Sequence, residues 1–156
     1  MRAFYNPSLG LLVLRIGLGV IFFLHGAQKL FGWFGGPGIQ GGTAFFASLG
    51  IPAPDIMIWV VGILELFGGL MLIAGFLVRV FGALLAIDML TATLLFHLPA
   101  GFFLTAEGRE GMEFTFILSL ASLAVALSGA GAYSLDAKRE GPTGAYTAPV
   151  YDRDEI

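Results

Sequence analysis

The residues best suited to chemistry lie inside stretches that are otherwise apolar. The segment RIGLGVIFFLHGAQKLFGWFGG, residues 15–36, carries Arg15, His25 and Lys29 within a sequence that is apolar enough for a bilayer. In a helix, His25 and Lys29 share one face because they are four residues apart, and Arg15 precedes Lys29 by two heptads on roughly that face. A charge at the bilayer centre costs at least about 2.5–3.5 kcal/mol, so this face is expected to point inward, toward carboxylates.

Two carboxylates are candidate counter-charges for these basic groups. Glu65 and Asp88 each lie ten residues from one end of their apolar stretch, which places them about 15 Å deep in the hydrocarbon. Their short side chains cannot reach the headgroups, so they are either paired or protonated. Lys29 is expected beside Glu65 as the first choice and Glu113 as the second. The alternative is that Lys29 extends to the interface without a partner.

Several other kinds of chemistry are not indicated. The chain has no cysteine, which excludes disulfides and thiolate metal sites. The two histidines lie in different stretches, without the spacing of a zinc-binding helix, so no metal site is expected. The glycine-rich segment GWFGGPG does not follow a strand, and phosphate binding is therefore not supported.

Composition makes lipid the expected solvent. Of the 156 residues, 57% are hydrophobic and only 12% are charged, whereas soluble domains carry about 25% charged residues. The mean hydropathy is +0.88. The net charge of -3 gives no indication of nucleic-acid binding.

Four apolar stretches are long enough to cross a bilayer, which takes about 20 residues in a helix. They are residues 9–31, 55–77, 79–98 and 112–133. The predicted fold is all-α, an integral membrane four-helix antiparallel bundle. Rows of small residues, such as Gly62 with Gly69 and Ser122 with Ala126, indicate close packing between the helices.

The connection between the first two stretches is expected to have two parts. GWFGGPGIQGG, residues 32–42, is too rich in glycine for a regular helix and is predicted to form a loop. TAFFASLG, residues 43–50, is predicted to form a short helix at the membrane interface. Residues 1–135 are therefore predicted to be the transmembrane domain, and the polar residues 136–156 a flexible cytoplasmic tail.

Four spans place both termini on one side of the membrane. Basic residues are more frequent on that side, namely Arg2, Arg79, Lys138, Arg139 and Arg153. The positive-inside rule then predicts a multi-pass protein of the bacterial inner membrane with both termini in the cytoplasm.

The order of these features resembles the DoxX family of small four-helix membrane proteins. The matching blocks are LRIGLGVIFFLHGAQKLFGWFGG, FFASLGIPAP, GILELFGGLMLIAGFLVR, FHLPAGFF and EGMEFTFILSLASLAVALSGAGAYSLD. They cover nearly the whole chain apart from the tail. By this resemblance, the residues on characteristic positions of the family are Arg15, His25, Gly26, Lys29, Glu65, Gly75, Arg79, His97, Glu113 and Ser134–Asp136.

The resemblance implies a membrane component of a quinone-linked oxidoreductase system. Its candidate catalytic residues would be His25, Lys29, Glu65 and Asp88, and its candidate quinone-binding residues Trp33, His97 and Glu113. Whether the chain is itself an enzyme stays open. The expected partners are lipid and either redox-complex subunits or further copies of the chain.

The alternative function is a non-catalytic accessory subunit of a larger membrane complex, in which the polar core only fixes how the helices pack. For single residues, simpler roles are also open: Trp33 as an interfacial anchor, His97 as a helix cap and Arg79 as a topology anchor. Arg15 could also reach the headgroups. A transporter is the least favoured function because no inverted repeat is visible.

Overall fold

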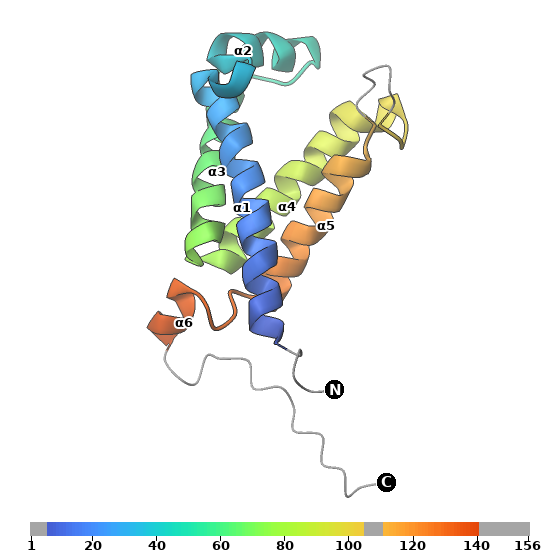
Figure 1. Ribbon diagram of the computed structural model, residues 1–156. Helices are drawn as coiled ribbons and strands as arrows, with labels where there is room; N and C mark the ends of the chain where they lie inside the picture. Colours follow the sequence, from blue (N-terminus) through green and yellow to red (C-terminus); the bar gives the residue numbers. More distant parts are fainter. Residues whose placement is uncertain (1–5, 105–110, 141–156) are drawn as a thin grey trace, which may run out of the picture.

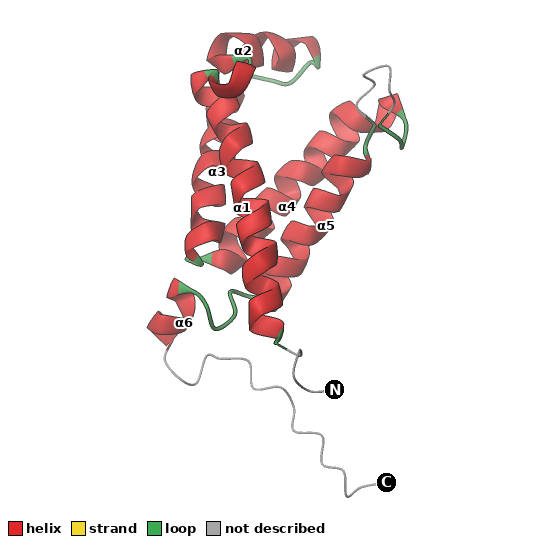
Figure 2. Ribbon diagram, viewed as in Figure 1, coloured by secondary structure: helices red, strands yellow, loops and turns green. Residues whose placement is uncertain are grey.

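The computed structural model of the chain describes residues 6–104 and 111–140 (Figure 1). Within these ranges every regular element is a helix and no strand occurs (Figure 2). The elements are α1 (Pro7–Phe31), η1 (Trp33–Gly35), α2 (Gly38–Ser48), α3 (Pro54–Ala74), α4 (Val78–Ala92), η2 (Thr93–His97), η3 (Leu98–Ala100), α5 (Glu113–Ser128) and α6 (Leu135–Glu140). Of these, η2 has π-helical and η1 and η3 have 3-10 geometry.

The long helices form two arms. The first arm is the pair of α1 and α3, and the second is the pair of α4 and α5. The arms meet beside α6 and spread apart toward α2 (Figure 1). We call the end that holds α6 and the α3–α4 turn the closed end, and the end that holds α2 and η2 the open end.

Glycines allow the helices of the first arm to approach closely. A Cβ atom added to Gly19 would lie 2.7 Å from the carbonyl oxygen of Gly69, and one added to Gly26 would lie 2.9 Å from that of Gly62. Both distances are shorter than side chains allow, so only glycine fits there. This confirms the prediction that the glycines spaced by seven residues mark close packing.

Small residues also define the contact within the second arm. A Cβ atom on Gly82 of α4 would lie 3.1 Å from the carbonyl oxygen of Ser122, beside Ala126 of α5. The apolar core draws on both arms and consists of Leu18, Phe22, Leu72, Val78, Leu85, Met89, Leu118 and Val125. This core lies where the arms converge, so it leaves the open end unfilled.

Within the part of the chain that the structure describes, three helices are long and apolar enough to cross a membrane: α1, α3 and the continuous stretch from α4 through η3, Val78–Ala100. The fourth predicted span is shorter than expected. Helix α5 has 16 residues and ends at Ser128, not at 133. The reason is Gly129, whose φ of +82° turns the chain out of the helix.

The prediction of a loop over the whole glycine-rich segment is wrong. Helix α2 begins at Gly38 and includes Gly41 and Gly42, so only residues 32–37 form the turn. Gly42 is buried where an added Cβ atom would collide with the side chain of Ile58. Packing of α2 against α3 thus favours a helix despite the low helix propensity of glycine.

The chain after α5 returns to the closed end. Asp136 in α6 accepts hydrogen bonds from the backbone N–H groups of Leu77 (2.9 Å) and Val78 (3.0 Å) at the start of α4. A carboxylate at a helix N-terminus satisfies free donors there and complements the helix dipole. The predicted tail therefore begins with residues that are part of the fold up to Glu140, and residues 141–156 lie outside the described part of the chain.

Candidate functional site

An ion pair links the two helices of the first arm. Lys29 of α1 donates from Nζ to Oε2 of Glu65 in α3 at 2.6 Å. The Glu65 side chain is only 2% exposed and that of Lys29 is 23% exposed. The close crossing at Gly26 brings these side chains within reach. The prediction that Lys29 lies beside Glu65 is confirmed.

The ion pair lies in a cleft between the arms at the open end. The cleft has a volume of about 1660 Å³, and its walls come from α1, α2, α3, α4, η2 and α5. Most of the lining is apolar, with aromatic rings from Phe22, Phe45, Phe96 and Phe114. The ionisable lining residues are His25, Lys29, Glu65, Asp88, His97 and Glu113. The structure thus brings six of the seven candidate site residues to one cleft.

Trp33 is the candidate that the structure does not bring to the cleft. It lies in η1, where its ring packs against Phe31 at 5.1 Å and Phe34 at 6.3 Å between centroids, and it is 51% exposed. The left-handed conformation of Gly32, with a φ of +67°, ends α1 and turns the chain away before Trp33. Its position agrees with the interfacial-anchor alternative.

Asp88 differs from Glu65 in its hydrogen bonds. Its Oδ2 atom is buried and has no hydrogen-bond partner among the described residues. It is close enough to both Glu65 and Lys29 to interact with them electrostatically. Two carboxylates and one ammonium group therefore share this part of the cleft, and one carboxylate oxygen, Oδ2 of Asp88, has no hydrogen-bond partner among the described residues.

Several other polar groups along the second arm are satisfied within the protein, whereas Oγ of Ser122 is buried without a hydrogen-bond partner among the described residues. The hydroxyl of Thr93 donates to the Met89 carbonyl at 2.7 Å and lies 2.9 Å from the hydroxyl of Thr115. Glu113 accepts a hydrogen bond from the backbone N–H of Leu104 at 2.9 Å. The sequence does not predict this threonine pair, because two threonines in separate apolar helices form no sequence pattern that shows they are in contact.

Arg15 belongs to a separate cluster at the closed end. It is completely buried and donates from Nη1 to the carbonyl of Leu72 (3.0 Å) and from Nη2 to that of Tyr133 (2.6 Å). Gly75, with a φ of +71°, leaves the space that the guanidinium fills. The expectation that Arg15 faces the deep carboxylates is wrong, and so is the alternative that it reaches the headgroups. Its partners are a carbonyl in the last turn of α3, where carbonyls lack intrahelical donors from a following turn, and a carbonyl in the segment between α5 and α6.

Arg79 makes the same kind of contact at the end of α5. Its Nη1 atom donates to the carbonyls of Ala126 (3.3 Å) and Leu127 (3.0 Å). A cation at a helix C-terminus is favoured by the free carbonyls and by the helix dipole. Arg15 and Arg79 thus connect helices at the closed end through hydrogen bonds to backbone carbonyls, whereas the open end has the ion pair and the cleft.

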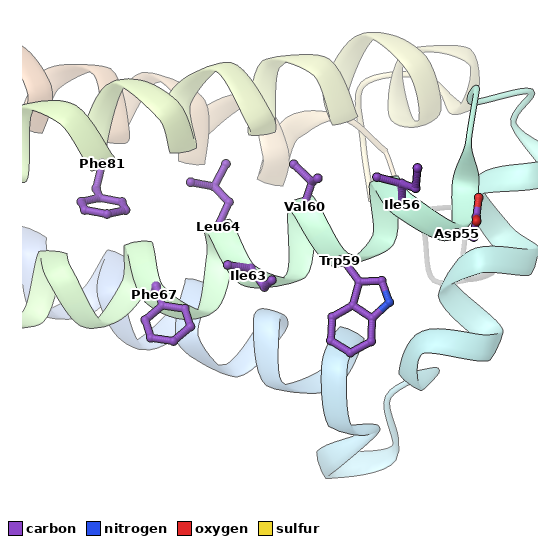
Figure 3. A pocket seen from close by; sticks show the side chains of 8 residues that line it. All are labelled: Asp55, Ile56, Trp59, Val60, Ile63, Leu64, Phe67 and Phe81. Atoms are coloured by element: carbon purple, nitrogen blue, oxygen red, sulfur yellow. The ribbon is translucent and has the colours of Figure 1, made fainter.

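A shallow hollow on the outer face of α3 contrasts with the cleft. It has a volume of about 630 Å³ and is lined by apolar side chains of α3 and by Phe81 of α4 (Figure 3). Asp55, at one end of this row, is its one ionisable lining residue (Figure 3). The apolar row suits lipid chains, and among its lining residues the Asp55 carboxylate at one end is the group that could bind a polar head.

The family assignment follows from comparison with known sequences. The DoxX family model matches residues 10–98, more than half of the chain, including Lys29, Glu65 and Asp88. The chain belongs to the DoxX family. It is a membrane protein, with the three candidate spans described above.

Named relatives extend the match over most of this DoxX chain. "Putative oxidoreductase CatD" of Bacillus subtilis is 34% identical over 129 residues, which cover 83% of this chain and 86% of the relative. "Inner membrane protein YqjF" of Escherichia coli is 32% identical, with 83% and 91% covered. "Uncharacterized membrane protein Rv3486" of Mycobacterium tuberculosis is 35% identical, with 79% and 77% covered. No solved structure matches the chain significantly.

Proposed function

We propose that this DoxX protein is a membrane component of a quinone-linked oxidoreductase system and that its cleft binds the quinone. The observation that supports this most is the combination of aromatic and apolar walls with a buried Lys29–Glu65 pair and Asp88 in one cleft. Ligand sites are typically apolar with a few convergent polar groups. A quinone has the matching form, a polar ring on an apolar chain, and it would supply the transfer of electrons together with protons.

Each polar group has a proposed role. Lys29 keeps two donor hydrogens beyond the one that Glu65 accepts, so it can still donate to a ring oxygen. His25, which lines the cleft one helical turn from Lys29, is the second proposed donor. Glu65 and Asp88 are the proposed proton carriers, since ionisable groups inside a membrane bundle are typical of proton relays. His97 and Glu113 are proposed to contact the ring from the other arm.

The proposed placement has α5 as a fourth span, α2 along the interface and both termini in the cytoplasm of a bacterial inner membrane. The relative named as an Escherichia coli inner membrane protein supports the location. A reporter that is active only in the cytoplasm should give a signal when it is fused after residue 156 and none when it is inserted between residues 49 and 53. The reverse pattern would exclude this topology.

A second candidate function is a non-catalytic subunit that packs against a larger membrane complex. The observation that favours it is the same cleft, because a gap between two arms could also take a helix of another subunit. Mild extraction from native membranes would then recover a stoichiometric partner, and mass spectrometry would identify it. A protein that is isolated alone and binds quinone would exclude this candidate.

Quinone binding can be measured directly on the purified protein in detergent. We expect a decyl-substituted benzoquinone to bind the wild type with one site per cleft in isothermal titration calorimetry. Glu65→Leu should weaken binding about tenfold or more, since it removes the group that holds Lys29 in place. Trp33→Leu is the matched control, because Trp33 lies outside the cleft. Equal loss in both variants, or no binding by the wild type, would refute the proposal.

A further inference from the structure

A buried carboxylate oxygen in the cleft, Oδ2 of Asp88, has no hydrogen-bond partner among the described residues, and it indicates what kind of head group the site selects. Resting on the proposed function of the cleft, we propose that Asp88 accepts a hydrogen bond from a hydroxyl of the ligand. The site would then prefer a hydroquinone, the hydroxyl-bearing form, over the same ring without a donor.

The first step is the hydrogen bonds that the lining residues already make. Glu65 accepts from Lys29 at 2.6 Å, and Oε1 of Glu113 accepts from the backbone of Leu104. The hydroxyl of Thr91 donates to the carbonyl of Ile87 at 2.8 Å, inside its own helix. Asp88 is different: among the described residues nothing donates to its buried Oδ2.

The second step is that leaving Oδ2 of Asp88 without a hydrogen bond costs free energy. A buried polar group without a hydrogen bond is unfavourable, and nearly all such groups in proteins find a partner. Asp88 does not belong to a loosely packed part of α4, because it follows the core residue Leu85 by one turn and is next to the core residue Met89. A partner is therefore expected from outside the protein, through the cleft that Asp88 lines.

The third step is the chemistry of that partner. In this proposal one ligand oxygen lies between the Lys29 donor and the Asp88 acceptor, which line the same cleft and interact electrostatically. A hydroxyl oxygen accepts from the ammonium group while its hydrogen is donated to the carboxylate. A quinone carbonyl or an ether oxygen can accept from Lys29 but has nothing to donate. Only the hydroxyl satisfies both side chains.

The test compares three ligands that share a ring and a decyl chain: a hydroquinone, its dimethyl ether and the corresponding benzoquinone. Reductant can be present throughout the hydroquinone titrations because the protein has no cysteine to perturb. We expect the wild type to bind the hydroquinone about tenfold tighter than the ether, the usual effect of a hydrogen bond to a charged group. In Asp88→Leu this ratio should fall to about one, with the affinity for the ether unchanged.

Two controls keep the test specific. Asp88→Asn keeps an acceptor oxygen of the same shape and should retain part of the preference. Thr91→Val alters the same wall of the cleft without removing a ligand contact and should leave the preference intact. If Asp88→Leu does not fold, the wild-type ratio and the Asn variant still decide the matter.

The outcomes separate this inference from the proposed function. Equal affinity for hydroquinone and ether in the wild type, or a preference that survives Asp88→Leu, would overturn the role of Asp88 while quinone binding stands. Failure of all three ligands to bind would overturn both.

Discussion

The closed and open ends use buried charge in different ways. At the closed end, Arg15 is completely buried and its Nη1 and Nη2 atoms donate to carbonyls at the end of α3 and near α6, while its Nε has no hydrogen-bond partner among the described residues. At the open end, the charged groups line a cleft of about 1660 Å³, and one carboxylate oxygen is buried without a partner among the described residues. The first arrangement fills its space with protein and the second leaves space for a ligand.

The contrast shows that a charged residue in a membrane helix has more than one explanation. Arg15 joins both arms because Leu72 lies in the last turn of α3 and Tyr133 follows α5. A planar guanidinium can satisfy two carbonyls at fixed geometry, which suits a structural joint. Lys29 instead carries a compact ammonium with spare donor hydrogens, which suits a site. The two basic groups of one helix thus have separate tasks.

The largest effect is expected from Arg15→Met. The substitution keeps much of the volume, but it leaves the Tyr133 carbonyl without its Arg15 donor and leaves the Leu72 carbonyl with only the backbone N–H of Gly75 at 3.3 Å. We expect a loss of about 3–5 kcal/mol in the free energy of unfolding, because the substitution breaks a buried hydrogen-bond network that joins both arms. Titration with SDS from mild detergent micelles would measure it. Lys138→Met, which removes an exposed cation of α6, is the control and should change little.

Arg15→Lys sharpens the same comparison. A single ammonium group cannot place two donors as a guanidinium does, so this variant should lie between wild type and Arg15→Met. Full stability of Arg15→Lys would show that charge alone, rather than the double hydrogen bond, joins the arms.

The second effect concerns the ion pair at the open end. Lys29→Met leaves Glu65 buried without its partner and should cost about 3 kcal/mol, the low end for buried pairs, since Lys29 is 23% exposed. Glu65→Leu should cost less, because the remaining lysine can extend toward the interface. The double variant should recover much of the loss and still fail to bind quinone.

A double-mutant cycle in detergent would measure the coupling between the two residues. Additive losses in the double variant would mean that the 2.6 Å contact contributes nothing to stability. A stable double variant with normal quinone binding would remove the pair from the proposed site.

The sequence predicted the ion pair for reasons that the structure bears out. The depth of Glu65 and the helical position of Lys29 both follow from regular helix geometry. The partners of Arg15 could not be predicted in this way. They are a backbone carbonyl in the last turn of α3 and one in the segment between α5 and α6, and the place where a helix ends depends on tertiary packing.

The errors in the fold have the same origin. The low helix propensity of glycine predicts a loop where α2 begins. The contact of Gly42 with Ile58, which the sequence does not reveal, favours a helix there instead. The cleft itself has no signature in the sequence, since it depends on the angle between two arms. Apolar residues that line it, such as Phe45 and Phe96, have the same character as those that face lipid.

A third, smaller effect tests the edge of the cleft. Phe45 of α2 and Phe96 of η2 stack edge to face at 4.8 Å between centroids, so they connect α2 with the second arm at the open end. Phe96→Leu should cost about 1 kcal/mol in stability, within the range for aromatic pairs. Because the arms are joined at the closed end, we expect the fold to persist and quinone dissociation to become faster. Stopped-flow dissociation would measure this, with Phe34→Leu as the control for an exposed ring.

The smallest effect is expected from removing residues 141–156. Their polar, proline-containing sequence predicts that they are dispensable for folding. The last described contacts of the C-terminal segment come from Ser134, from Asp136, which binds the start of α4, and from Arg139, whose guanidinium lies 5.2 Å from the centre of the Phe76 ring. A chain that stops after Glu140 should therefore accumulate in membranes and change its stability by less than about 0.5 kcal/mol. A chain that stops after Ala132 loses Asp136 and the Tyr133 carbonyl that Arg15 binds, so it should lose stability as Arg15→Met does. The chain that stops after Glu140 could instead lose as much stability as the chain that stops after Ala132. The closed end would then include residues beyond Glu140, and the contrast between the filled end and the open end would have to be redrawn to include them.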